Sequence, residues 1–547
     1  LMKSDYDYDY SQSKVNDYDC DYADLQALLV ELPALPERTP ISPPISSNAR
    51  PPPLSSFMPA SMEEIKKIIL SSKPTSCALD PIPTKLLKEC LEAVLPIITR
   101  IVNLSLSEGM MPHSLKKAIV IPLLKKINLV LEILKNYRPV SNLSYLSKVI
   151  ERVVASRINT HMDLNFLHEL LQSAYKALHS CETALIRVHN DVLEAVDRGQ
   201  CVMLVLLDLS AAFDTVDHDR LLRVVSERIG LNGTALEWLR SYLSDRIQSV
   251  TIDGVESEIW KILFGVPQGS VLGPILFIIY TSPLGDILRK HGVTFHCYAD
   301  DTQRYLAFNV NNTEDTIKIM ENCISDIRNW MATSFLRLND DKTELLIIGT
   351  PQMLKKLPPI QLSVGNDNIT PSTTARNIGA LFDSNLSMSC HISNMCKSAW
   401  HQLRQIGNIR QYLDSSSTKT LMHSFVSSRL DTFNSMLYGV PKHQLGRLQR
   451  VQNAAARMIT KSKKYEHVTP LLKELHWLPI EQRIHYKILL TAYKALHDKA
   501  PSYLKDLIHV SNKNRNLRSN SQLLLLVPKC RLSSYGGRAF SHSAPYL

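Results

Sequence analysis

Two adjacent aspartates, Asp300 and Asp301, are the residues of this sequence best suited to chemistry. They lie between two apolar segments, residues 293–297 and 305–308, whose pattern predicts a β-hairpin with the acids at its tip. Two carboxylates held close together repel each other unless a cation neutralises them. A solvated Asp-Asp turn is the simple alternative, because aspartate is common in turns.

A third carboxylate, Asp208, favours a metal site. It follows six consecutive apolar residues, 202–207, which predict a strand buried on both faces, although a helix is also compatible with the run. At the end of that strand, Asp208 is either a solvated cap or a site residue. Three aspartates at strand ends can hold two divalent metal ions for in-line phosphoryl displacement, and hard oxygen ligands favour Mg²⁺.

A loop rich in glycine and proline, residues 265–274, precedes the apolar residues 275–280. The pattern predicts a tight loop leading into a buried helix. The glycines could allow close approach to a ligand or could serve only the turn, and no Gly-Lys-Ser/Thr closes a phosphate loop. Lys125 and Arg138 flank strand-like segments, where they could reach phosphate oxygens or could be ordinary surface residues.

Helices are predicted on both sides of these segments. Ser61 is a plausible N-cap for a helix that begins at Met62, and residues 84–107 and 147–159 also have a helical pattern. Residues 391–470 contain twelve Lys or Arg and three Asp or Glu, a net charge of +9. One helical face in this region is apolar and another carries Arg447, Arg450, Arg457 and Lys461. Such a basic face could lie along a nucleic-acid duplex or could be solvated.

Composition indicates a globular, basic protein. The 547 residues are 44% hydrophobic and carry a net charge of +10, whereas residues 1–60 have four basic and nine acidic side chains, a net of −5. A basic body suggests a polyanionic partner. The ten cysteines include no Cys-x-x-Cys pair, and the sequence has no secretory signal and no apolar run of membrane-spanning length. We therefore expect no membrane partner and an intracellular location, in the nucleus or cytoplasm.

Three sequence blocks occur in an order typical of one enzyme family: LLDLSAAFDTVDH at 206–218, GVPQGSVLGP at 265–274 and YADD at 298–301. They resemble the catalytic blocks of reverse transcriptases. Blocks at 80–90, 137–153, 336–349 and 375–387 resemble the non-LTR (LINE-type) retrotransposon branch, and residues 476–504 are similar to the region after the polymerase in vertebrate elements. The resemblance covers roughly residues 60 to 547.

The resemblance implies an α+β right-hand polymerase, with fingers, a palm built on an antiparallel sheet and a helical thumb, followed by a helical C-terminal region. The expected divisions are a disordered acidic and Pro/Ser-rich leader (1–59), an N-terminal helical extension (60–104), the reverse transcriptase domain (105–383), a basic helical thumb and C-terminal region (384–510), and a truncated tail (511–547).

The resemblance also implies roles for individual residues. Asp208, Asp300 and Asp301 match the catalytic carboxylates that hold two Mg²⁺ ions, for which Mn²⁺ could substitute, and Lys342 matches a lysine that protonates the leaving pyrophosphate. Phe213 matches an aromatic gate against the 2′-hydroxyl; by pattern alone it would be a core aromatic. The matching nucleotide-binding residues are Lys125, Arg138, Gln268 and Gly269. The hairpin that grips the primer end matches Gly379, Leu381 and Asp383.

The expected function is RNA-directed DNA polymerisation, in which a DNA 3′-hydroxyl is extended on an RNA template with dNTPs, as in target-primed retrotransposition. No endonuclease is expected in the 60 low-complexity residues ahead of the polymerase, so it would act in trans. Arg304 stands where the family usually has an apolar residue. The missing nuclease, the abrupt ends and Arg304 suggest a catalytically silent nucleic-acid-binding protein as the alternative. A metal-dependent nuclease fits the carboxylates but not Phe213 or the Gln268-Gly269 loop.

Overall fold

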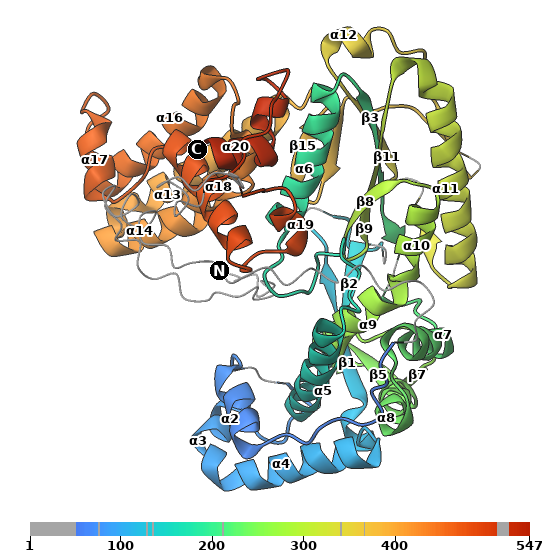
Figure 1. Cartoon of the computed structure of the whole chain (residues 1–547). Helices are drawn as coiled ribbons and strands as arrows, with labels where there is room; N and C mark the ends of the chain where they lie inside the picture. The colour runs from blue at the N-terminus through green and yellow to red at the C-terminus, as the bar shows by residue number, and fades with distance from the viewer. Residues whose placement is uncertain are drawn as a thin grey trace, which may run out of the picture.

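The computed structural model describes residues 51–74, 77–126, 129–133, 136–210, 213–339, 342–365, 367–510 and 524–547. Most of the predicted leader and part of the predicted tail lie outside these ranges. The fold is α+β, as expected. Figure 1 shows a central sheet with helices on both sides, a second sheet and the N-terminal helices below it, and a large helical region beside it.

The N-terminal helices are α2 (Met62–Ser71), α3 (Thr84–Glu89) and α4 (Leu91–Glu108). The predicted N-cap is confirmed, since the Ser61 hydroxyl accepts a hydrogen bond from the Glu64 amide at 3.1 Å. The helix predicted over 84–107 is two helices that meet at Cys90. The expected division at residue 104 falls inside α4, because its apolar face continues to Leu106.

The fingers sheet comprises β1 (Lys117–Leu124), β2 (Tyr137–Leu143), β5 (Arg246–Ile252), β6 (Val255–Glu256) and β7 (Trp260–Ile262). The order is β2-β1-β5-β6, with β7 also on β5; β1 is antiparallel to β2 and parallel to β5. Around it lie η1 (His113–Leu115), α5 (Tyr145–Leu164), α7 (His218–Val224), the π turn η3 (Val225–Ile229) and α8 (Gly233–Leu243).

The palm sheet is antiparallel, in the order β11-β3-β9-β8. Its strands are β3 (Cys201–Leu207), β8 (Thr294–Tyr298), β9 (Asp301–Phe308) and β11 (Glu344–Ile348). The prediction that residues 202–207 form a strand buried on both faces is confirmed. Two hydrophobic cores lie on opposite faces of this sheet. Met203 packs into the first core and Leu204 into the second core, as the two-residue period of a strand requires.

Helices cover both faces of the palm sheet (Figure 1). One face meets α6 (Cys181–Asp197), and the other meets α9 (Leu272–Thr281), α10 (Pro283–Lys290) and α11 (Thr313–Thr333). Short elements complete the region: β4 (Leu209–Ser210) with β10 (Arg337–Leu338), η4 (Val310–Asn312), α12 (Pro351–Leu354), the hairpin β12 (Leu362–Val364) and β13 (Asp367–Ile369), and the hairpin β14 (Thr374–Asn377) and β15 (Ala380–Asp383).

The remaining chain is helical and shares its core with α6. Its elements are α13 (Ser389–Ile409), η6 (Arg410–Tyr412), α14 (Ser415–Met422), the π turn η7 (His423–Ser427), α15 (Ser428–Asp431), η8 (Asn434–Leu437), α16 (Lys442–Thr460), α17 (Val468–Glu474), α18 (Ile480–Leu496), α19 (Ser502–Lys505), η10 (Gly536–Arg538) and α20 (Phe540–Tyr546). None of the described helices has the length and apolar character needed to cross a bilayer.

The C-terminal residues correct one expectation. The sequence suggested a truncated tail over 511–547, but within it α20 packs into the second core, with Phe540 5% and Ala544 3% exposed. Its apolar residues are few and widely spaced, so only the tertiary contacts reveal the helix.

Candidate active site

The three predicted aspartates converge at one end of the palm sheet. Asp208 immediately follows β3, and Asp301 is the first residue of β9. Leu207 pairs with Thr302 in the register of these two strands, so Asp208 and Asp301 follow that pair at the same edge. Tyr298 pairs with Asp301, which leaves Ala299 and Asp300 as a two-residue turn between β8 and β9. The predicted hairpin with acids at its tip is confirmed.

The charges of these carboxylates influence one another. Burial, and then the charge of Asp208, raises the pKa of Asp300, whereas the charges of Lys342 and Arg138 lower it. Burial, followed by the charges of Asp300 and Asp208, raises the pKa of Asp301 to about 6. The charges of two neighbouring carboxylates thus add to the effect of burial at Asp301.

Lys342 neutralises part of this negative charge. Its ammonium lies 2.7 Å from Asp208 Oδ2 and is 66% exposed, whereas the Asp208 side chain is 24% exposed. Asn339 fixes the same residue, because its backbone N–H donates to the Asp208 carbonyl at 2.9 Å. Lys342 therefore lies beside Asp208, and its predicted role in protonating the leaving pyrophosphate stays a prediction.

The carboxylates have the chemistry of a divalent-cation site, since their oxygens are hard ligands and their mutual repulsion is relieved by positive charge. Across the described residues, no three His, Cys, Asp or Glu side chains are grouped closely enough to hold a metal ion. The carboxylates of Asp208, Asp300 and Asp301 are therefore neighbours, but they would have to move closer together to bind an ion. The metal site stays a prediction.

The loop at 265–270 packs against both the palm and the fingers. The Val266 N–H donates to the Phe213 carbonyl at 2.9 Å, and the Ser141 N–H of β2 donates to the Gln268 carbonyl at 2.7 Å. Gly269 has φ +125°, and a Cβ there would lie 2.6 Å from the Ser141 carbonyl oxygen. Glycine is thus required by backbone approach to β2, which supports the turn interpretation of this residue.

Phe213 is half-buried and stacks on Phe277 of α9, with ring centroids 4.6 Å apart. This contact is what a core aromatic would make, and it also fixes the ring just after Asp208. The predicted gate role is compatible with this position but is not tested by it.

Lys125 and Arg138 lie at the same end of the β1–β2 hairpin. Both are exposed, and the Lys125 N–H donates to the Asn136 carbonyl at 2.8 Å. The charge of Arg138 reaches Asp300 strongly enough to lower its pKa. Arg138 is therefore a neighbour of the carboxylates, as predicted for a phosphate-binding residue.

The predicted primer-gripping hairpin is present as β14–β15. Gly379 lies in its two-residue turn with φ +94°, and the Leu381 N–H donates to His391 Nδ1 at 3.4 Å. The Asp383 carboxylate accepts hydrogen bonds from the backbone of Asn385, Ser387 and Met388 and from the Ser387 hydroxyl. Asp383 thus fixes the turn into α13, a role that the sequence did not predict.

The predicted basic face of α16 is only partly free. Arg450 is exposed, and Lys461 caps the helix with φ +57°. Arg447 donates to Gln444, and Arg457 donates to the Glu466 carbonyl at 3.0 Å. Two of the four side chains therefore have contacts within the protein, and the nucleic-acid role of the face stays a prediction.

Sequence reasoning missed two residues that support the site. Glu151 of α5 is fully buried and accepts from the Val271 and Leu272 amides at the start of α9, at 2.7 and 3.1 Å. Gln172 is 5% exposed and bonds both backbone groups of Ala299, next to Asp300. Both act over more than 100 residues, so no local pattern could have identified them.

Comparisons with known proteins agree with this geometry. Residues 124–380 match the family model described as reverse transcriptase (RNA-dependent DNA polymerase). A probable RNA-directed DNA polymerase from transposon BS of Drosophila melanogaster is 26% identical over 77% of this chain and 46% of that protein. An RNA-directed DNA polymerase from the mobile element jockey of Drosophila funebris is 31% identical over 44% of this chain and 27% of its own length.

A third relative covers more of the chain. The probable RNA-directed DNA polymerase from transposon X-element of Drosophila melanogaster is 24% identical over 88% of this chain and 52% of that protein. The chain therefore spans about half the length, or less, of these relatives. Telomerase from Candida albicans aligns with 76% of the chain at 13% identity and a TM-score of 0.35. Residues 124–380 are thus similar to reverse transcriptase domains, and the chain is similar to RNA-directed DNA polymerases of insect mobile elements.

Proposed function

We propose that this chain is an RNA-directed DNA polymerase that extends a DNA 3′-hydroxyl on an RNA template, as in target-primed retrotransposition. The convergence of Asp208, Asp300 and Asp301 at one edge of the palm sheet, within the segment that matches the reverse transcriptase model, carries the proposal. The finer assignments, a vertebrate-type element and an endonuclease acting in trans, stay predictions, as do the domain divisions and a nuclear or cytoplasmic location; the relatives described above are insect elements.

The aspartates would hold two Mg²⁺ ions, or Mn²⁺ as a substitute. When bound, such ions supply charge neutralisation and activation of the attacking hydroxyl. Lys342 adds a positive charge at Asp208, and it would donate a proton to the departing pyrophosphate. Because it is exposed, Lys342 can leave Asp208 at little cost when an ion binds.

The fingers residues would receive the triphosphate of an incoming dNTP. Lys125 and Arg138 are exposed at the end of the β1–β2 hairpin, and the Arg138 charge already reaches Asp300. The loop that contains Gln268 joins this hairpin to Phe213 through two backbone hydrogen bonds, because the Ser141 N–H donates to the Gln268 carbonyl and the Val266 N–H donates to the Phe213 carbonyl. The nucleotide would therefore lie between the fingers hairpin and Phe213, with its phosphates toward the carboxylates.

Contacts with the template–primer duplex are assigned to β14–β15 and the basic face of α16. Gly379 and Leu381 offer backbone groups close to the primer end, whereas Asp383 would act through the turn that it fixes. Arg450 and Lys461 are exposed and could meet phosphates, and Arg447 and Arg457 would first have to exchange their present partners.

Primer extension on an RNA template with Mg²⁺ and dNTPs tests the proposal. We expect wild-type product and a loss of about a thousandfold in Asp300→Asn, the scale for removing one charge-stabilising group. The matched control is Asp253→Asn, because Asp253 also lies at the tip of a two-residue hairpin, between β5 and β6, outside the carboxylate cluster. Absence of product from folded wild-type protein, or equal product from Asp300→Asn, contradicts the proposal.

The catalytically silent binding protein is the second candidate, and buried Arg304 favours it. Arg304 is fully buried in β9, four residues past Asp300. A silent binding protein should bind an RNA–DNA hybrid in a salt-dependent way without extending a primer.

The assignment of Phe213 as the gate against the 2′-hydroxyl has its own test. Phe213→Val should admit ribonucleotides while dNTP use persists, and unchanged discrimination between the two would refute the assignment.

A further inference from the structure

The turn that carries Asp300 is strained and is held by one side chain. Ala299 has φ +56°, a left-handed conformation that costs a residue with a Cβ about 1–2 kcal/mol. The Gln172 amide accepts from the Ala299 N–H at 3.0 Å and donates to the Ala299 carbonyl at 3.1 Å. The same Oε1 also accepts from the Ala174 N–H at 3.0 Å. Gln172 therefore fixes both backbone groups of the residue before Asp300.

Gln172 is itself fixed because its segment extends the palm sheet. The Cys297 N–H donates to the Leu171 carbonyl at 2.7 Å, and the Ser173 N–H donates to the Cys297 carbonyl at 2.9 Å. Gln172 and Cys297 form a parallel bridge. Residues 171–173 thus pair with β8 through a single parallel bridge, two residues before Ala299.

A chain of hydroxyl groups links residues 171–173 to the C-terminal region. Ser173 Oγ lies 2.8 Å from His296 Nε2 and 2.8 Å from the Tyr503 hydroxyl, and the Tyr503 hydroxyl donates to Thr183 Oγ1 at 3.1 Å. Thr183 Oγ1 in turn donates to the Ser180 carbonyl at 2.9 Å. If His296 donates through Nε2, each hydroxyl donates once to the next member, so the hydrogen bonds run in one consistent direction from His296 to the Ser180 carbonyl; Thr183 Oγ1 also accepts from the Ser180 N–H.

The hydroxyl chain is buried inside the protein. His296 is fully buried and Tyr503 is 3% exposed, with ring centroids 4.9 Å apart in an edge-to-face arrangement. Burial lowers the pKa of His296 to about 3, which keeps its ring neutral at physiological pH. A neutral hydrogen-bond chain in such a site holds its members in place without a charge to attract water.

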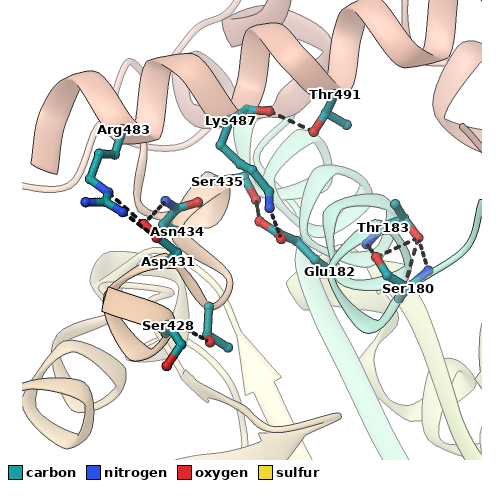
Figure 2. A network of polar contacts seen from close by, with 11 residues as sticks. Ser180, Glu182, Thr183, Ser428, Asp431, Asn434, Ser435, Arg483, Lys487 and Thr491 are labelled. Atoms are coloured by element: carbon teal, nitrogen blue, oxygen red, sulfur yellow. Dashed lines mark hydrogen bonds and ion pairs between the residues drawn. The ribbon is translucent and has the colours of Figure 1, made fainter. Parts of the chain in front are cut away.

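The helix α18, which precedes Tyr503 in the chain, is anchored to both α6 and α15. Figure 2 shows Lys487 and Arg483 of α18 reaching two different acids. Lys487 Nζ lies 3.0 Å from Glu182 Oε2 at the start of α6, and the Ser435 hydroxyl donates to Glu182 Oε1 at 2.6 Å. Arg483 donates to both oxygens of Asp431 in α15, at 2.8 and 2.5 Å.

These contacts place α19 firmly. α18 is tied to α6 through Glu182 and to α15 through Asp431, and α19 follows α18 closely in the chain. Arg187 of α6 adds a hydrogen bond to the Tyr503 carbonyl at 3.2 Å. Tyr503 therefore presents its hydroxyl to Ser173 from a position fixed at both its backbone and its ring.

We propose that the C-terminal region takes part in building the active site, with Tyr503, Ser173 and Gln172 acting as positioning residues that hold the Asp300 turn. The inference rests on the proposed polymerase function for its catalytic consequence. It assigns a role to α18 and α19, which lie outside the segment 124–380 that matches the reverse transcriptase model. Loss of the chain should loosen the turn first, and through it the site of Asp300.

Hydrogen–deuterium exchange at the Ala299 amide tests the inference without requiring activity. Gln172→Met keeps the side-chain length, removes the acceptor and gives the fully released reference. Tyr503→Phe and Ser173→Ala should each speed exchange by about three- to tenfold, the range for one hydrogen bond. The matched control is Tyr145→Phe, because Tyr145 is also buried and its hydroxyl lies 2.6 Å from Ser72 Oγ, among the N-terminal helices.

Two results overturn the proposal: wild-type exchange at Ala299 in both Tyr503→Phe and Ser173→Ala, or faster exchange throughout the protein in these variants and in Tyr145→Phe alike. Primer extension adds a second readout. We expect the half-saturating Mg²⁺ concentration to rise about three- to tenfold in Tyr503→Phe and not in Tyr145→Phe. If wild-type protein extends no primer, the proposed function fails, while the exchange experiment still decides whether Tyr503 holds the turn.

Discussion

The two hairpins β8–β9 and β14–β15 each close with two residues and each place a residue with a Cβ at positive φ in the turn. In β8–β9 this residue is Ala299, with φ +56°; in β14–β15 it is Ile378, with φ +42°, followed by Gly379 at +94°. The first turn is held by hydrogen bonds from Gln172. The second has a glycine at its other position, and Ile378 packs against the second core.

The difference concerns how accurately a turn must be placed. Apolar packing holds a hairpin but lets its tip adjust, whereas two hydrogen bonds to one residue fix its direction. The hairpin with the directional contacts is the one that carries Asp300 and Asp301. Strain of this kind persists only where the surrounding structure imposes it. Here Gln172 imposes it, a residue that contacts the turn but lies 127 positions earlier in the sequence.

The raised pKa values in the β8–β9 hairpin should make metal binding depend on pH, and within the comparison of the two hairpins this is the largest effect we expect. An ion must displace protons from Asp300 and Asp301, whose pKa values are raised, to about 6 for Asp301. Mg²⁺ affinity should therefore rise about tenfold per pH unit from pH 5 to 6 and level off above 7. Calorimetric titration of Mg²⁺ measures this directly, and an affinity independent of pH over that range contradicts it.

The same raised pKa has an opposite effect on the metal-free protein. The folded state holds the Asp301 proton more tightly than the unfolded chain, whose ordinary value is 3.8. The stability contributed by this group is complete below that value and is lost as pH rises through about 6. Urea unfolding without metal should show a larger loss in wild type than in Asp301→Asn, in which only Asp300 keeps a raised pKa at this turn.

A buried charge in one arm of the catalytic hairpin gives the next largest effect. The Arg304 guanidinium is fully buried, and its three nitrogens have no hydrogen-bond partner among the described residues. Burial lowers the pKa of Arg304 to about 10, so it stays charged at neutral pH. Arg304→Met should raise the free energy of unfolding by about 2 kcal/mol, measured by urea denaturation.

Arg246→Met is the matched control for that prediction. Arg246 is also buried, but it donates to the Tyr242 carbonyl at 3.1 Å and lies 4.9 Å from the centre of the Tyr242 ring. Its replacement should lower stability. If Arg304→Met is destabilising as well, the Arg304 guanidinium has favourable contacts, and the buried charge does not weaken the hairpin.

The sequence predicted those parts of the site that depend on local patterns. The run before Asp208 and the apolar segments around Asp300 and Asp301 indicated buried strands, because strand periodicity and burial are visible within a few residues. The contacts of Gln172 and Glu151 were not predictable, since they join segments more than 100 residues apart. Helical periodicity likewise identified the basic face of α16, but only the fold shows that Arg457 donates to a carbonyl.

At Gly379, the second position of the β14–β15 turn, a side chain should be disfavoured by the backbone conformation and not by lack of space. A Cβ at Gly379 would lie 3.5 Å from the Phe433 ring, an ordinary contact, so Gly379→Ala tests φ +94° alone. We expect a loss of about 1–2 kcal/mol in the free energy of unfolding, with Mg²⁺ affinity unchanged. A change in Mg²⁺ affinity would mean that the two hairpins are coupled.

The smallest effect should come from the matching change in the catalytic turn, Ala299→Gly. Removing the Cβ relieves about 1–2 kcal/mol of left-handed strain, and the greater freedom of glycine in the unfolded chain offsets about 0.4–1 kcal/mol of this. The net gain in the free energy of unfolding should be about 0.5–1 kcal/mol, measured by urea denaturation beside Gly379→Ala. Because Gln172 bonds only the backbone of Ala299, its hydrogen bonds should survive and Mg²⁺ affinity should change less than about twofold. A loss of stability in Ala299→Gly would show that the turn is not strained, and that Gln172 stabilises a conformation the chain already prefers.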